Sequence, residues 1–253
     1  MKSSIIMTAV LGATFLASAS LNASDNHKAG DKQPAKVVDS GTFGIFVKGK
    51  RVGTEKFRIE QKADYAVATS EIKVEDGNTR ADQSSEMQIL SNGELRSYSW
   101  RATQPQKEET TIEPKDQLLM EHVVPADQKK MDVPHVLPLT TVILDDNFFS
   151  QREILVWRYL ATGCLPKQGP EAQLMCGPSH FGVLVPHQHL ASNVVVELLG
   201  RDKITYKGAT REANKIKIDA DGVQWFLWVG EPDEQYKVLK MTIPANDVEV
   251  VRD

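Results

Sequence analysis

Strand-length segments joined by very short turns occupy most of this chain. The pairs Asp76-Gly77, Asn92-Gly93 and Asp221-Gly222 lie between such segments, and pairs of this kind are typical of hairpin turns. Two strands joined by so short a turn are antiparallel neighbours, because parallel strands need a much longer connection. The pattern therefore predicts consecutive hairpins over residues 42–124 and further strands over residues 181–251, with residues 194–199 and 203–207 as two separate strands.

The polarity of the segments indicates what kind of sheet they form. Over residues 95–102, Tyr98 and Trp100 share one face while Ser97 and Ser99 share the other. Long strands with one largely polar face suit a broad curved sheet better than the core of a tight sandwich.

One segment has the spacing of a helix. Residues 125–146 show no clear period and are expected to form a crossing loop, and residues 148–160 then carry a wide apolar stripe at helical spacing. The preceding Asp145-Asp146-Asn147 offers N-cap side chains, and Gly163 is expected to end the helix.

These observations predict the fold class. Residues 223–229 are apolar on both faces, with Trp225 on one and Trp228 on the other, so both faces should be covered. We expect a mainly β protein, an antiparallel curved sheet that forms a partly closed barrel with one helix packed against its concave face. Residues 37–253 would form this single domain, and a division into two domains near residue 130 is the alternative.

The N-terminal residues predict export. Lys2 precedes an apolar run that is shorter than a membrane span, and the small residues Ala17-Ser18-Ala19 follow it. We interpret residues 1–19 as a signal peptide and the small, polar residues 20–36 as a disordered spacer. The mature protein is then expected in the periplasm or outside the cell, with no transmembrane segment.

Export determines how the two cysteines are interpreted. Cys164 and Cys176 flank a segment that contains Pro166, Gly169 and Pro170 and can fold back on itself. In an oxidising compartment such a pair favours a disulfide bond, and the C-x-x-C spacing of a redox pair is absent. Free thiols or metal ligands are the alternatives.

Three segments stand out for their resemblance to other proteins. They are TFGIFVKGKRVGTEKFRIE (residues 42–60), ILDDNFFSQREILVWRYL (143–160) and LWVGEPDEQYKVLKMTIPANDVEVVRD (227–253). Together they resemble bacterial exported β-rich proteins of unknown function. More distantly, such proteins are similar to the Lol-type lipoprotein carriers, which implies a half-closed barrel that shelters an acyl chain under helices.

Charge and motifs narrow the classes of function. The chain has 30 Lys and Arg against 34 Asp and Glu, a net charge of −4, so no basic field indicates a nucleic-acid partner. The sequence contains no G-x-S-x-G, H-E-x-x-H, Walker A or G-x-G-x-x-G motif, so we expect no catalytic residue and no cofactor, and an enzyme is the less favoured class.

The large aromatic residues are the candidate ligand site. On the helix and on the strands that it should cover, they would line a pocket for a lipid or another apolar small molecule, although such residues more commonly form the core. The candidates are Trp100, Phe148, Phe149, Trp157, Trp225 and Trp228.

Two further functions stay open. One is a structural or assembly factor that engages an envelope protein partner through its sheet edges. The other is a hydrolase or metal enzyme around His180, His187 and His189, because residues i and i+2 of a strand share a face and His187 and His189 could then bind one ion. Two histidines alone are too few ligands, so we expect no metal site.

Overall fold

Short turns connect the first eight strands, and each strand pairs with the next one along the chain. The structure is a computed structural model that describes residues 35–77, 79–126, 129–166 and 174–253. The strands of this half are β1 (Lys36–Val47), β2 (Lys50–Gln61), β3 (Tyr65–Asp76), β4 (Thr79–Leu90), β5 (Leu95–Gln104), β6 (Glu108–Lys115), β7 (Leu118–Pro125) and β8 (Met131–His135). The predicted signal peptide and nearly all of the predicted spacer lie outside the described residues.

The second half of the chain continues the same sheet from the other side of β1. Its elements are β9 (Val142–Ile143), α1 (Ser150–Gly163), β10 (Cys164–Pro166), β11 (Leu174–Cys176), β12 (Ser179–Val185), β13 (Leu190–Tyr206), β14 (Ala209–Ala220), β15 (Val223–Val229), β16 (Val238–Ile243) and β17 (Val248–Arg252). Short 3-10 helices η1 (Pro186–Gln188), η2 (Pro232–Glu234) and η3 (Pro244–Asn246) lie at three of the turns.

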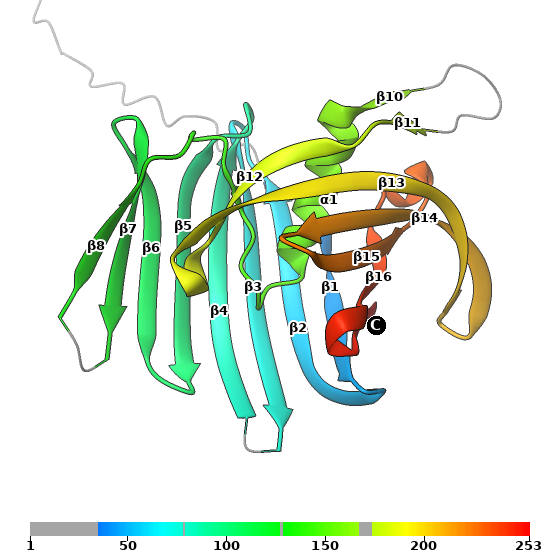
Figure 1. Cartoon of the computed structure of the whole chain (residues 1–253), viewed down its shortest axis with the longest axis horizontal. Helices are drawn as coiled ribbons and strands as arrows, with labels where there is room; N and C mark the ends of the chain where they lie inside the picture. Colours follow the sequence, from blue (N-terminus) through cyan, green and yellow to red (C-terminus); the bar gives the residue numbers. More distant parts are fainter. Residues whose placement is uncertain (1–34, 78, 127–128, 167–173) are drawn as a thin grey trace, which may run out of the picture. The chain divides into compact units, whose positions relative to one another are not determined.

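The strand order explains how the two halves join. Among the described residues, the large sheet runs β8-β7-β6-β5-β4-β3-β2-β1-β17-β16-β15-β14-β13-β12-β9, and only the β12–β9 pair at one edge is parallel. The first strand therefore lies beside the last. Figure 1 shows the first half as a wall of long strands and the second half, in yellow to red, curving away from it.

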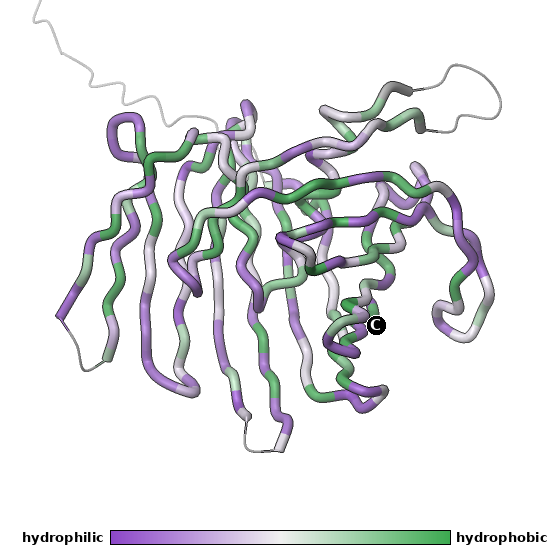
Figure 2. Tube along the Cα trace, in the orientation of Figure 1, coloured by the Kyte–Doolittle hydropathy of each residue, from purple (hydrophilic) through white to green (hydrophobic). Residues whose placement is uncertain are grey.

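The sheet curves around α1 without closing into a barrel. Side chains of α1 and of strands from both halves form one large buried cluster, to which Phe43, Met87, Leu155, Val196 and Leu227 belong. Along the strands, apolar and polar residues alternate (Figure 2), so one face supplies the core and the other meets solvent. The structure confirms the predicted mainly β, antiparallel curved sheet with one helix on its concave face.

Polar contacts join the two arms of the sheet, that is, the strands β7 and β8 near one edge and the β12–β13 hairpin near the other. Both oxygens of the fully buried Glu121, on β7, accept contacts from histidines: His135 Nε2 lies 2.8 Å from one oxygen and His189 Nδ1 lies 2.8 Å from the other. His189 lies in the turn between β12 and β13, directly after η1. In the same turn, His187 packs edge-on against Trp100 of β5. We call the contact of Glu121 with these two histidines the seam.

Three predictions of local structure are wrong. Residues 131–135 form β8 within the stretch that was expected to be an irregular loop, and β13 is one strand where two were expected. Figure 1 shows β13 as a long curved arm, and its pairing with β14 shifts register at Gly200, whose φ of +107° a glycine adopts readily. The helix begins at Ser150 instead of residue 148, and Gly163 ends it as predicted.

No helix among the described residues is long and apolar enough to cross a membrane.

Candidate functional site

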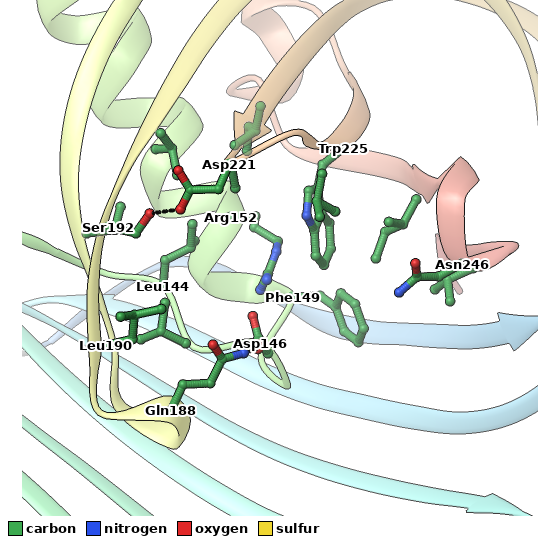
Figure 3. Close-up of a pocket in the computed structure, with 18 of the residues that line it drawn as sticks. Leu144, Asp146, Phe149, Arg152, Gln188, Leu190, Ser192, Asp221, Trp225 and Asn246 are labelled. Carbon is green, nitrogen blue, oxygen red and sulfur yellow. Dashed lines mark hydrogen bonds between the residues drawn. The ribbon is translucent and has the colours of Figure 1, made fainter.

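A cavity of about 590 Å³ lies between the N-terminal end of α1 and the concave face of the sheet. We call it the first cavity. Strands of both halves of the chain line it with aliphatic side chains, among them Ile45, Val47, Val52, Val183, Val194 and Ile218. Figure 3 shows its polar residues from the sheet, the turns and α1 converging on the same space.

The guanidinium of Arg152 forms part of the cavity wall. It lies 3.8 Å from the ring centroid of Trp225 and 5.7 Å from that of Phe149, so it stacks on aromatic faces that themselves line the cavity. One of its nitrogens donates to the carbonyl oxygens of Asp145 and Phe148. Burial lowers the pKa of Arg152 to about 10, so this side chain is still charged at neutral pH.

Three carboxyl groups compensate this charge. Asp146, Asp145 and Glu55 oppose the effect of burial on Arg152 by their negative charge. Burial in turn raises the pKa of both Glu55 and Asp145. Because the positive charge already has these acidic neighbours, the first cavity offers an apolar lining with a neutralised polar patch, a combination suited to an uncharged or weakly polar ligand.

The mouth of the first cavity combines apolar and polar side chains. Leu190 and Val223 line it while 49% and 41% of their surfaces remain exposed. Beside them, Gln188 donates to Asp146 and Ser192 donates to Asp221. Exposed apolar residues at a cavity mouth give an apolar ligand a continuous path from the surface.

A second cavity, of about 440 Å³, lies along the later turns of α1. Its lining is mainly apolar and includes Met87, Ile89, Leu95, Val142, Ile154 and Trp157, while Gln61, Ser91 and Thr141 contribute uncharged polar side chains. Arg158 is the charged residue of this lining. The fully buried Leu155 belongs to the lining of the second cavity.

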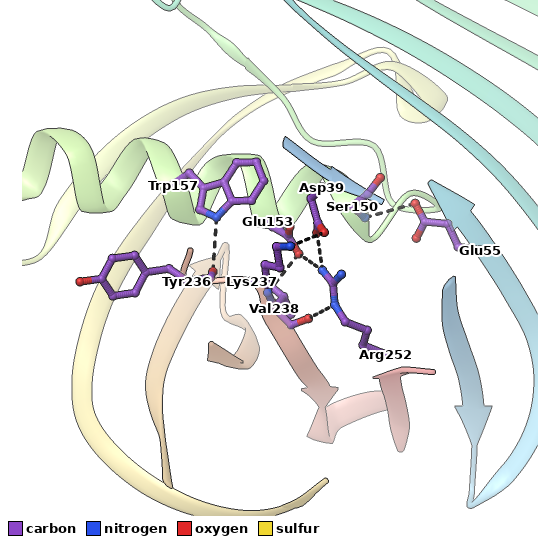
Figure 4. A network of polar contacts seen from close by, with 9 residues as sticks. All are labelled: Asp39, Glu55, Ser150, Glu153, Trp157, Tyr236, Lys237, Val238 and Arg252. Carbon is purple, nitrogen blue, oxygen red and sulfur yellow. Dashed lines mark hydrogen bonds and ion pairs between the residues drawn. The ribbon is translucent and has the colours of Figure 1, made fainter. Parts of the chain in front are cut away.

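A buried polar cluster fixes α1 to the sheet. Arg252 of β17 donates to Asp39 Oδ2 at 2.8 Å, to the carbonyl oxygen of Val238 at 2.7 Å and to Glu153 of the helix (Figure 4). Lys237 Nζ lies 3.1 Å from the other oxygen of Asp39. Burial raises the pKa of Glu153 well above its ordinary value, whereas the pKa of Asp39 is lowered by its hydrogen bonds and by the charge of Arg252, in spite of its burial.

The six aromatic candidates lie in different places. Phe149 and Trp225 line the first cavity, and Trp157 lines the second and donates to the carbonyl oxygen of Tyr236. Phe148 is fully buried and lines neither cavity.

The remaining two candidates are held by other contacts. Trp100 donates its indole N–H to Gln83, and Trp228 packs on the other face of the sheet with Ile204, Ala213 and Leu239. The structure therefore brings Phe149 and Trp225 together and does not place Phe148, Trp100 or Trp228 with them.

The histidine pattern was interpreted on a wrong local structure. His187 lies in η1 and His189 adopts a left-handed backbone with φ of +52°, so the two do not share a strand face. His180 is an exposed residue of β12. Within the described ranges, no group of three or more His, Cys, Asp or Glu side chains is arranged to hold a metal ion.

Cys164 and Cys176 form the predicted disulfide bond. The two residues are directly paired across the small sheet of β10 and β11, with Cα atoms 4.1 Å apart. The bond joins the two strands of this small sheet, which lies between α1 and β12 along the chain.

Sequence reasoning did not select Arg152, Arg158 or the aliphatic residues that form most of both linings. A signal was present for Arg158, which lies between Trp157 and Tyr159, whereas Arg152 lies between Gln151 and Glu153. The aliphatic lining gives no signal of its own, because the same alternation of Val and Ile also describes a filled core.

Comparison with known proteins adds a likeness of fold. No protein-family model and no curated protein matches this chain. Among solved structures, it is similar to the crystal structure of a β-barrel-like protein of a domain of unknown function, DUF1849, from Brucella abortus. The two chains are 8% identical, with a TM-score of 0.52, and the match covers 85% of this chain and 94% of that chain.

Proposed function

We propose that this chain is an exported, non-enzymatic protein that binds an apolar or amphipathic ligand in the first cavity. The observation that carries the proposal is the cavity of about 590 Å³ between α1 and the sheet, lined by aliphatic side chains of both halves. Its volume falls in the range of about 300–1,000 Å³ that ligand pockets occupy. A well-packed core contains few voids larger than a water molecule, so a space of this size supports a ligand site.

The polar groups of the lining support binding over catalysis. The hydroxyl group of Ser192 donates to Asp221 and does not pair with a histidine. Arg152 is engaged by backbone carbonyls and aromatic rings. These groups fix the orientation of a ligand, and none of these contacts forms the nucleophile–base pair that hydrolysis of an ester or amide requires.

Export is supported by the leader-like residues 1–19 and by the disulfide bond. Structural disulfides persist in the periplasm and outside the cell and are rare in a reducing cytosol. The half-closed fold also agrees with the distant resemblance to the Lol-type carriers, in which a curved sheet shelters an acyl chain.

The proposal is tested by filling the first cavity. Ala220, at the end of β14, lines the cavity, and Ala209, at the start of the same strand, is exposed and does not. We expect Ala220→Trp to abolish saturable binding of an uncharged fluorescent alkyl probe to the first cavity and Ala209→Trp to leave it unchanged. Equal binding by the two variants, or no saturable binding by the unmodified protein, would contradict the proposal.

Engagement of an envelope partner through a sheet edge is the second candidate. It is favoured by β8, an edge strand at which Met131 and the following Val136 are 45% and 88% exposed. Pro134 and Asp132 lie in the same strand and reduce its capacity to pair with another strand. Crosslinking from position 136 in a bacterial envelope tests this candidate, and the absence of any specific adduct would exclude it.

A further inference from the structure

We infer that the second cavity is a separate binding site for a single-chain anionic amphiphile, with the alkyl chain in the cavity and the anionic head group on Arg158. The inference rests on the proposed function in so far as both place an amphiphile against α1. It goes further by assigning a second site, the charge of the head group and the residue that recognises it.

The second cavity has the composition of an alkyl-chain site. Its volume of about 440 Å³ lies within the range of ligand pockets, and its lining is supplied mainly by aliphatic and aromatic side chains such as Ile89, Val142 and Ile154. Ala66 and Ala161 contribute small side chains on opposite sides, from β3 and from α1. The lining thus provides apolar contact for a chain and very few polar partners along its length.

Arg158 is the charged residue of this lining, and its donors are largely unused. A guanidinium carries five N–H donors, and this one makes a single contact, 3.5 Å from its Nη1 to the carbonyl oxygen of Gly93, at the long limit for a hydrogen bond. Its charge also lies 5.9 Å from the ring centroid of Phe181. Among the described residues, no carboxylate forms an ion pair with it.

The electrostatics agree with this geometry. Burial lowers the pKa of Arg158, and no acidic neighbour in the described part of the chain counteracts that effect. A half-buried cation without a counter-charge is stabilised by an anion that reaches it. Carboxylate and phosphate groups match the fork of the guanidinium and accept two parallel hydrogen bonds from it.

A comparison with Arg152 of α1 and Arg252 of β17 explains why the anionic head group is assigned to Arg158. Arg152, in the first cavity, already has Asp146, Asp145 and Glu55 as acidic neighbours. Arg252 is paired with Asp39 and Glu153. An anionic head group would meet negative charge at either of these sites and meets an unpaired positive charge at Arg158.

The experiment compares three twelve-carbon amphiphiles below their micellar concentrations by titration calorimetry. Dodecanoate and dodecyl phosphate carry the two anionic head groups, and dodecyltrimethylammonium is the cationic counterpart. Charge-assisted hydrogen bonds to Arg158 predict that the two anions bind about tenfold to a hundredfold more tightly than the cation. Equal affinity for anions and cation would overturn the inference, and a preference for one anion would identify the head group.

Variants assign the preference to the residue and to the cavity. Arg158→Gln is expected to remove the preference for anions, whereas Arg80→Gln, which removes the same charge from an exposed position at the far end of β4, is expected to keep it. Ala161→Trp adds bulk from the surface of the helix into the second cavity and should weaken all binding there. Unchanged anion preference in Arg158→Gln would overturn the inference.

The cavity variants also separate this inference from the proposed function. Binding of dodecanoate that survives Ala161→Trp and is lost in Ala220→Trp would place the chain in the first cavity, so the proposed function would stand and the inference would fail. Absence of binding of any amphiphile to the unmodified protein would contradict both.

Discussion

Arg252 illustrates how single residues decide whether a helix can lie inside this sheet. Its guanidinium is 8% exposed and contacts the nearly inaccessible Asp39 and Glu153. A buried ion pair adds little net stability compared with an apolar replacement of both partners, but the loss of one partner leaves a buried charge uncompensated. The position of α1 therefore depends on the complete cluster.

Arg252→Met is expected to lower the free energy of unfolding by about 3–5 kcal/mol, because it leaves Asp39 buried without its main partner. Arg51→Met is the matched control. Arg51 forms an ion pair with Asp253 at the surface, where 44% of the arginine side chain is exposed, and such pairs contribute about 0–1 kcal/mol. Denaturant unfolding of both variants measures the difference, and equal losses would contradict this account of the cluster.

Glu153 predicts a dependence of stability on pH. Its pKa is raised well above the ordinary 4.5 in the folded chain, so the folded state keeps a proton that the unfolded state releases near pH 4.5. The folded state binds more protons in this window, so the free energy of unfolding falls as the pH rises from 4.5 toward the folded pKa. The stabilisation is fully present below pH 4.5 and is lost above the folded pKa.

Glu153→Gln should flatten this part of the pH profile. The amide oxygen can accept the hydrogen bonds that the carboxyl group accepts from Val238 and Arg252, and the amide needs no proton to do so. The measurement is the difference in unfolding free energy between the variant and the unmodified protein at several pH values above 4.5. A difference that does not change with pH would show that Glu153 keeps an ordinary pKa.

The start of α1 is set by a hydrogen-bond acceptor on a strand that is distant in the sequence. The backbone N–H groups of Phe149 and Ser150 donate to Glu55 of β2 at 2.8 and 3.2 Å, and Ser70 of β3 donates to the same carboxyl group. The residue at the N-cap position, Phe149, offers no side-chain acceptor. Glu55 therefore supplies the cap, and a negative charge at a helix N-terminus is favourable.

Glu55→Gln is expected to destabilise the fold by about 1–2 kcal/mol, because the amide accepts fewer hydrogen bonds and removes the charge at the helix N-terminus. Glu71→Gln, at an exposed position of β3, is the control and should change stability little. Thermal unfolding, with the helical signal as the readout, compares the two. A loss in Glu55→Gln no greater than in Glu71→Gln would contradict the role of Glu55 as a cap.

The elements also show how far the sequence predicts this fold. Alternation and turn pairs such as Asp76-Gly77 identified most strands, because hairpins are local in the sequence. The start of α1 was missed because its cap lies 94 residues away from Phe149, and the local Asp145-Asp146-Asn147 was the only visible acceptor group. The strand β8 was missed because Pro134 reads as a break, although proline is tolerated at a sheet edge.

The candidate site was predictable only in part for a related reason. The sequence placed Phe149 and Trp225 near the helix and the concave face, where both line the first cavity. It could not distinguish a lined space from a filled core, since the same aliphatic residues form either. The sequence also did not predict how His187 and His189 are oriented, because the 3-10 helix η1 replaces the expected strand at His187.

The large sheet curls far enough for β7, near one edge, to contact the turn between β12 and β13, near the other edge. The seam joins β7 to the start of β13 through Glu121, and the first cavity opens beside it at Gln188 and Leu190. Loss of the seam should therefore release the β12–β13 hairpin without unfolding the wall of long strands.

Glu121→Ala is expected to accelerate amide hydrogen exchange in η1 and the start of β13 by about fivefold to a hundredfold, because it leaves the buried His135 without its partner and His189 without its anchor. Glu113→Ala, at an exposed position on the adjacent β6, is the control and should leave exchange there unchanged. Equal protection of residues 186–192 in both variants would show that the seam does not hold the arms together.

The space between α1 and the sheet is expected to hold an apolar or amphipathic ligand. Native mass spectrometry of the protein exported into a bacterial periplasm and purified without detergent tests this claim most directly. We predict an added mass that dissociates as an alkyl-chain compound and whose occupancy falls in Ala220→Trp but not in Ala209→Trp. A spectrum that contains only the mass of the polypeptide would contradict it.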